Sequence, residues 1–285
     1  MLERAAAVKE YRAATSRFDA VSVSELAPLV CRSILLDDGE GVPPVEVLPG
    51  EPSSIVRLPA NVWDQLPLQG LQPVLRTQSL HASLQHFVRT FGALWPSRQH
   101  YIRDWITAVH WVEQDPEKPG PLLTSSTFPA LPHCAFLSTK AKRHIPPNIV
   151  LEADSGYALF ENLYHEALHQ QLSTTILFTD SIASAFSSST CTKISVPWRG
   201  SSWEPDRVLH ATFVYSGLLR LRREAAIAEN QVPMELDLMN AVKEAHQALT
   251  YLIEQFTHVR PAFSDAGQQL VDEVLHCAMS ALDGR

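Results

Sequence analysis

The sequence lacks the features that mark secreted, membrane-spanning and disulfide-rich proteins. It has 4 Cys in 285 residues, widely spaced and without a Cys-x-x-Cys pair. This spacing indicates neither a disulfide framework nor a zinc ribbon, and reduced thiols are expected. No apolar run approaches the ~20 residues that cross a bilayer, so no membrane contact is expected. The first residues mix acidic and basic side chains instead of forming the apolar stretch of a signal peptide. We therefore expect a cytoplasmic protein.

Basic charge is scarce as well. The chain has 23 Lys and Arg against 31 Asp and Glu, a net charge of −8. Nucleic-acid-binding proteins usually carry a basic excess, so no nucleic-acid partner is expected. Apolar residues make up 45% of the chain and charged residues 19%, which is typical of a globular protein.

The predicted elements indicate a mainly α fold with a small β-sheet (α+β), with the helix over 155–176 and the C-terminal helices around a metal pocket. Residues 1–125 are expected to form a helical and β region, for which peptide docking is one interpretation. Residues 126–285 form the expected metal-binding catalytic region, and one continuous domain is the alternative. Helices are predicted over 1–37, 77–95, 97–113, 155–176, 204–229, 234–258 and 263–283, strands over 45–48, 54–58, 134–138 and 148–151, and a proline-rich loop over 115–133.

The clearest motif is His-Glu-x-x-His, within the predicted helix over 155–176. His165 and His169 are four positions apart, so both imidazoles lie on one helical face. Neutral imidazole binds zinc, iron, copper and nickel. Asp154 and Ser155 are suited to cap the start of this helix. The alternative is an amphipathic helix whose two histidines only pack or face solvent.

A metal site on this motif needs at least one further ligand. The metzincin pattern is excluded, because Leu172 and Thr175 stand where it requires Gly and His. Glu204 and Glu224 follow in the order that gluzincins use, but neither lies in the Asn-Glu-x-x-Ser-Asp pattern of those enzymes. His210 lies in a predicted helix and is a further candidate, although a single helical histidine is more often a core or surface residue.

Two segments resemble a known family. Val196-Pro197-Trp198-Arg199 is followed, after ten residues, by His210-Ala211-Thr212-Phe213-Val214-Tyr215. Upstream, Leu131-Pro132-His133-Cys134-Ala135-Phe136-Leu137-Ser138 is similar to a Leu-Pro-Gly-x-x-Phe-Leu-Ser strand. Together they resemble the HExxH-type proteins associated with ribosomally synthesised, post-translationally modified peptides. Members of that family are described as 2-oxoglutarate-dependent peptide β-hydroxylases, and the resemblance covers roughly residues 125–225.

The chain departs from the family pattern at three positions. Trp203 stands where a second Arg is frequent, Ala211 replaces the Gly after the distal His, and His133 replaces the Gly of the upstream strand. These differences bear on the substrate more than on the metal.

The resemblance implies a ligand set and a cofactor. His165, His169 and His210 would hold Fe(II), and Arg199 would bind the distal carboxylate of 2-oxoglutarate, for which the planar guanidinium is suited. Three imidazoles, two oxygens of 2-oxoglutarate and O2 would complete six positions. Three His ligands suit Zn(II) equally well, so the ligand set leaves the metal open. Arg207 is a weaker alternative to Arg199.

Glu166 is the catalytic candidate, and its role depends on the metal. In a zinc peptidase it would be the general base for the metal-bound water. In an oxygenase it would orient a ligand, hold the substrate backbone or contact the metal, or it would be a helix-surface residue.

Three functional hypotheses follow. The first is Fe(II)/2-oxoglutarate-dependent β-hydroxylation of a side chain in a precursor peptide, during modified-peptide natural-product biosynthesis, with a leader region as one route of recognition. The second is a zinc-dependent HExxH metallopeptidase. The third is a non-enzymatic peptide-binding module with a relic metal site. The sequence leaves the oligomeric state and the modified residue open.

Overall fold

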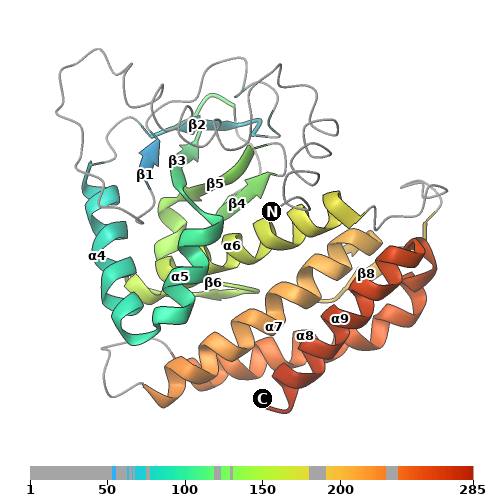
Figure 1. The fold of residues 1–285 in the computed structure, drawn as a ribbon. Coiled ribbons are helices and arrows are strands. Elements are labelled where there is room, and N and C mark those ends of the chain that lie inside the picture. Colours follow the sequence, from blue (N-terminus) through green and yellow to red (C-terminus); the bar gives the residue numbers. More distant parts are fainter. Residues whose placement is uncertain are drawn as a thin grey trace, which may run out of the picture. The chain divides into compact units, whose positions relative to one another are not determined.

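A computed structural model of the chain describes residues 53–55, 63, 66, 68–74, 78–118, 123–128, 131–179, 191–228 and 237–284. The helix predicted over 1–37, the strand predicted over 45–48 and Cys31 lie outside the described residues. The described part is mostly helical with small sheets, which confirms the predicted fold class (Figure 1).

The chain divides into two compact units. The first comprises the described residues up to His144 together with Glu152–Gln170. The second comprises Ile145–Leu151 and the described residues from Gln171 onward. Whether residues 1–125 dock a peptide stays a prediction.

The first unit is built on a five-stranded sheet with the order β1-β3-β5-β4, and β2 also pairs with β3. Its strands are β1 (Ser53–Ile55), β2 (Leu71–Pro73), β3 (Ala108–Gln114), β4 (Ser125–Phe128) and β5 (Leu131–Ser138). β1 and β5 run parallel to β3, while β4 runs antiparallel to β5 and forms one edge of the sheet. Residues of β3 and β5 therefore form much of the core of this unit, since both strands are central.

The helix predicted over 97–113 is wrong beyond Trp105, because the chain forms β3 from Ala108 onward. The first five residues of β3 are all buried. A short apolar run that is buried on both faces has no clear two-residue alternation, so its periodicity does not distinguish a strand from a buried helix. The β-branched and aromatic side chains of Val109, Trp111 and Val112 favour the strand.

Three helices accompany the sheet: α4 (Gln78–Leu94), α5 (Pro96–Trp105) and α6 (Gly156–Thr179). Phe91 and Trp95 stack with ring centroids 5.6 Å apart, and both rings contact Tyr157 and Phe160 of α6. Gly156 lets Phe87 of α4 lie close to the start of α6, because a Cβ at position 156 would be 2.2 Å from the Phe87 ring. The aromatic cluster thus fixes the start of α6 against the end of α4.

The second unit contains α7 (Pro205–Ile227), α8 (Leu238–Val259) and α9 (Asp265–Leu282), which lie close to the predicted bounds and pack against each other (Figure 1). Asp237 caps α8 by accepting from the Asn240 N–H at 2.9 Å, and Ser264 caps α9 through the Gly267 N–H at 3.1 Å. Short two-stranded sheets pair β6 (His144–Ile145) with β7 (Ile149–Val150), and β8 (Ile194–Val196) with β9 (Ser201–Trp203).

Arginine side chains of α7 bond the backbone of the neighbouring helices. Arg222 is fully buried and donates to the carbonyls of Pro146 and Ala241, the latter at 2.9 Å. Arg220 donates to the Cys277 carbonyl at 3.0 Å, and Arg223 to the Leu282 carbonyl at 3.1 Å. These bonds join α7 to the start of α8 and the end of α9. None of the helices in the described part combines the length and hydropathy needed to cross a membrane.

Candidate metal centre

The HExxH segment lies in the middle of α6, as predicted. Ser155 caps the helix by accepting from the Ala158 N–H at 3.2 Å. The apolar residues around the motif are buried, among them Leu163, Ala167 and Leu168. The two histidines are half-buried, and the side chain of His165 is 17% exposed.

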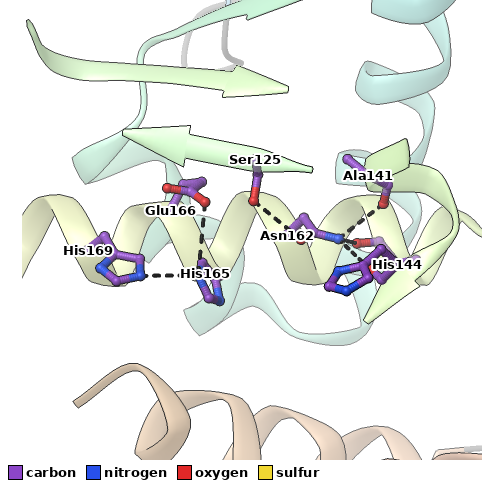
Figure 2. A network of polar contacts seen from close by, with 8 residues as sticks. Ser125, Ala141, His144, Asn162, His165, Glu166 and His169 are labelled. Atoms are coloured by element: carbon purple, nitrogen blue, oxygen red, sulfur yellow. Dashed lines mark hydrogen bonds and ion pairs between the residues drawn. The ribbon is translucent and has the colours of Figure 1, made fainter. Parts of the chain in front are cut away.

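The structure brings His165 and His169 together as a facing pair. Their Nε2 atoms are 3.1 Å apart and their ring centroids 4.7 Å apart (Figure 2). If each nitrogen lies about 2.1 Å from one ion, this separation corresponds to an N–metal–N angle of roughly 95°. Such an angle is close to the value for octahedral iron and within reach of tetrahedral zinc. The two residues therefore fit a metal ion as a chelating pair.

Glu166 points from α6 toward β4 (Figure 2). It is only 2% exposed, and burial raises the pKa of its carboxyl to about 7, while hydrogen bonds with Ser125 and Thr127 oppose the rise. One carboxylate oxygen lies 3.9 Å from the His165 Nε2. Glu166 is therefore near the histidine pair, and the hydroxyls of β4 hold it.

Asn162, one turn before Glu166, connects the same helix to two other segments. Its Nδ2 donates to the carbonyls of Ala141 at 3.1 Å and His144 at 2.7 Å, and its Oδ1 accepts from Ser125 at 3.4 Å (Figure 2). A fully buried amide with these partners fixes the rotation of α6 about its axis. The orientation of the histidine pair depends on that rotation.

Sequence reasoning did not identify Ser125, Thr127 and Asn162 as parts of the site. The predicted loop over 115–133 is wrong where β4 forms and where β5 begins. The β-branched Thr127 and the aromatic Phe128 were the available signal for a strand, but surrounding prolines obscured it.

Tyr164, immediately before His165, is buried among groups that hold its ring. The Arg98 guanidinium donates to its hydroxyl at 3.0 Å and lies 5.5 Å from its ring centroid. Tyr101 meets it edge-on at 5.4 Å, and burial raises the pKa of Tyr101 far above its usual range. α5 thereby supports the HExxH segment from a second direction.

His210, the expected third ligand, lies in the second turn of α7 in the second unit. Burial lowers its pKa to about 4, so the ring is neutral at physiological pH. Neutral imidazole is the form that binds metals. Its role as a ligand stays a prediction. In the described part of the chain, no group of three or more His, Cys, Asp or Glu side chains is placed to hold a metal ion.

Arg199 lies in the turn between β8 and β9, also in the second unit, and its side chain is exposed. Its N–H donates to the Val196 carbonyl at 3.0 Å. The preceding Trp198 packs edge-on against Trp203, Tyr215 and Tyr251, which anchors the turn. An exposed guanidinium on an anchored turn is available to an anion, but its binding of 2-oxoglutarate stays a prediction.

The two glutamates that follow the motif in gluzincin order, Glu204 and Glu224, lie on or next to α7. Glu204 precedes α7 and pairs with Lys193 at 3.2 Å. Glu224 lies near the end of α7, five turns beyond the start of that helix.

His133, which stands at a family Gly position, has a backbone φ of 61°. This left-handed conformation is one that glycine adopts without steric cost. Its ring stacks on Trp105 with centroids 6.2 Å apart, and burial lowers its pKa.

No protein-family model matches the chain, and no curated protein matches it in sequence.

Proposed function

We propose that this protein is an Fe(II)/2-oxoglutarate-dependent hydroxylase that acts on the β-carbon of a side chain in a precursor peptide. The observation that carries the proposal is the facing pair of His165 and His169, whose nitrogens are 3.1 Å apart on a helix fixed by buried polar contacts. The segments around Arg199 and His210 resemble those of the 2-oxoglutarate-dependent peptide hydroxylases. We favour iron and 2-oxoglutarate over other metal chemistry because of this resemblance.

The chain contributes binding and positioning. His165, His169 and His210 would hold the iron, and Arg199 would bind the distal carboxylate of 2-oxoglutarate. When bound, iron with 2-oxoglutarate and O2 supplies the oxidant that inserts one oxygen atom into a C–H bond, with succinate and CO2 as co-products. Three protein ligands leave positions for the cosubstrates on an octahedral ion.

Glu166 is assigned a positioning role under this proposal. Its carboxyl is held by two hydroxyls of β4, and it lies 3.9 Å from the His165 Nε2. A carboxyl bound in this way connects the ligand helix to the sheet. Hydroxylation needs no general base at this position.

A zinc peptidase is the second candidate, and the 3.9 Å approach of Glu166 to the His165 Nε2 favours it. An ion held by that nitrogen would bring its bound water near the carboxylate, which is the arrangement of general-base catalysis in HExxH peptidases. Glu166→Gln distinguishes the two candidates. The substitution keeps the shape of the side chain and removes the base, so it should abolish peptide cleavage but leave 2-oxoglutarate turnover measurable.

The deciding experiment is anaerobic reconstitution with Fe(II) followed by addition of 2-oxoglutarate. We expect a visible metal-to-ligand charge-transfer band that is lost in His165→Ala and His210→Ala and weakened in Arg199→Ala. His246→Ala, a substitution of an exposed histidine on α8, is the matched control and should keep the band. If the wild-type protein retains one equivalent of zinc and shows no band, the hydroxylase proposal is overturned and the peptidase becomes the favoured function.

A further inference from the structure

The outer edge of β4 offers backbone hydrogen-bonding groups in a known register. β4 pairs with β5 on one side only, and no described strand pairs with its other side. The opposed residues are Ser125 with Leu137, Ser126 with Phe136, and Thr127 with Ala135. One step earlier in the same register, the Ser138 N–H donates to the Thr124 carbonyl at 3.0 Å.

This bond identifies which residues of β4 point their backbone groups outward. In an antiparallel pair, hydrogen-bonded and non-hydrogen-bonded residue pairs alternate. Thr124 belongs to a hydrogen-bonded pair, so Ser126 also bonds toward β5. Ser125 and Thr127 belong to non-hydrogen-bonded pairs. Their N–H and C=O groups therefore point away from β5, to the outer edge.

The same two residues connect the edge to the HExxH helix. Their side chains lie on one face of the strand, because they are two positions apart. Ser125 donates to Asn162 at 3.4 Å (Figure 2). The hydroxyls of Ser125 and Thr127 also bond Glu166, the neighbour of His165. The edge thus has two residues with outward backbone donors and acceptors, and it runs beside the helix that carries the histidine pair.

We propose that the outer edge of β4 binds the substrate peptide as an added strand, through the backbone N–H and C=O groups of Ser125 and Thr127. The choice of a peptide as the occupant rests on the proposed function. A second extended backbone repeats its donors and acceptors at the two-residue spacing of such an edge, which a compact small molecule does not. Recognition of this kind depends on the peptide backbone and tolerates different side chains.

The edge is suited to a short segment only. β4 ends in a register shift between Thr127 and Phe128, so the regular ladder stops after Thr127. All four residues of β4 are half-buried, so none of them is closed off completely by the described residues. The structure thus points to a substrate held by about three residues of backbone, the length that the edge can pair.

The test measures peptide retention on the full, metal-free chain, so it is independent of catalysis. The probe is a pool of dye-labelled decapeptides with random side chains and capped ends, and retention is measured by equilibrium dialysis. The comparison pool has every backbone amide N-methylated, which removes all the donors that an added strand could use, on either of its edges. We expect wild-type protein to retain the unmethylated pool about tenfold more, the effect of losing one or two hydrogen bonds.

Two substitutions at one position separate backbone from side chain. Thr127→Pro removes the outward N–H, and an edge strand tolerates Pro there because that N–H does not bond β5. It should lower retention to the level of the methylated pool. Thr127→Val removes the hydroxyl and keeps the N–H, so retention should stay within about twofold, because no added-strand bond is lost.

Equal retention of the two pools, or retention of neither, overturns the proposal. The same holds if Thr127→Pro retains as much as wild type, or if Thr127→Val loses as much as Thr127→Pro. Should Thr127→Pro fail to fold, the comparison of the two pools on wild-type protein still decides. A charge-transfer band without preferential retention would support the hydroxylase proposal and overturn peptide binding at the β4 edge. Preferential retention without the band would support peptide binding at the edge and overturn the hydroxylase proposal.

Discussion

α6 and α7 carry the histidines that the proposed function assigns to the metal, but the other polar side chains of the two helices have different partners. On α6, Glu166 and Asn162 bond side chains and carbonyls around the histidine pair. On α7, Arg222 and Arg223 lie more than three turns from His210 and bond backbone carbonyls of other helices. The buried polar atoms of α6 therefore surround the histidine pair, whereas those of α7 bond neighbouring segments of the backbone. We therefore expect substitutions around the histidine pair of α6 to lower activity and substitutions of the buried arginine of α7 to lower stability.

The largest effect is expected at the histidine pair. His165→Ala removes one of the two facing nitrogens, so the chelating pair on α6 is lost and only two of the three proposed ligands remain. We expect metal retention and 2-oxoglutarate turnover to fall below detection, while the urea midpoint changes little, since the side chain is partly exposed. Elemental analysis and a succinate assay measure the two losses. Stoichiometric iron in this variant would mean that the pair is not the centre.

On α7 the expected loss is in stability. Arg222→Met removes the charged donor of the buried carbonyls of Pro146 and Ala241, and a hydrogen bond to a charged group contributes about 1.5–3 kcal/mol. We therefore expect the free energy of unfolding in urea to fall by about 3 kcal/mol, with full metal retention by the folded protein. Arg207→Met, on an exposed position of the same helix, is the control and should change stability by less than about 0.5 kcal/mol. Equal effects of the two substitutions would show that the buried bonds contribute nothing.

Glu166 gives the α6 site a pH-dependent effect on stability. Burial raises its pKa to about 7 in the folded protein, above the ~4.3 of an unfolded chain. The folded state then binds the proton more tightly, so this contribution to stability is full below about pH 4 and is lost as pH rises through 7. In metal-free protein, Glu166→Gln should remove this decline and gain about 2 kcal/mol relative to wild type between pH 5 and pH 8. Glu254→Gln, an exposed α8 control, should keep the decline.

The smallest effect is expected at His133, whose φ of 61° costs a non-glycine residue about 1 kcal/mol. His133→Gly relieves this cost but loses the stacking on Trp105, so its stability should stay near that of wild type. His133→Ala loses the ring and keeps the strain, and it should be about 1 kcal/mol less stable than His133→Gly. Thermal melts of the three proteins measure the order. An alanine variant as stable as the glycine variant would exclude backbone strain at this position.

Most of the long helices and the central strand β5 were predictable from the sequence, whereas β3 and β4 were not. α6 begins one residue from its predicted start, because Ser155 provides a cap that local sequence encodes. The helices predicted over 204–229, 234–258 and 263–283 are confirmed as α7, α8 and α9. β3 was missed because a strand buried on both faces lacks alternation, and β4 because it is short and lies among prolines.

The sequence by itself determined the facing of His165 and His169, because a four-residue separation on an α-helix places two side chains on one face whatever surrounds them. The surroundings of Glu166 were decided only by the tertiary structure. Ser125 and Asn162 are 37 positions apart in the chain, and the folding of β4 beside α6 is what brings them within 3.4 Å. Side-chain spacing along a helix is local geometry, whereas the burial of a carboxyl and the register of an edge strand depend on contacts between distant segments.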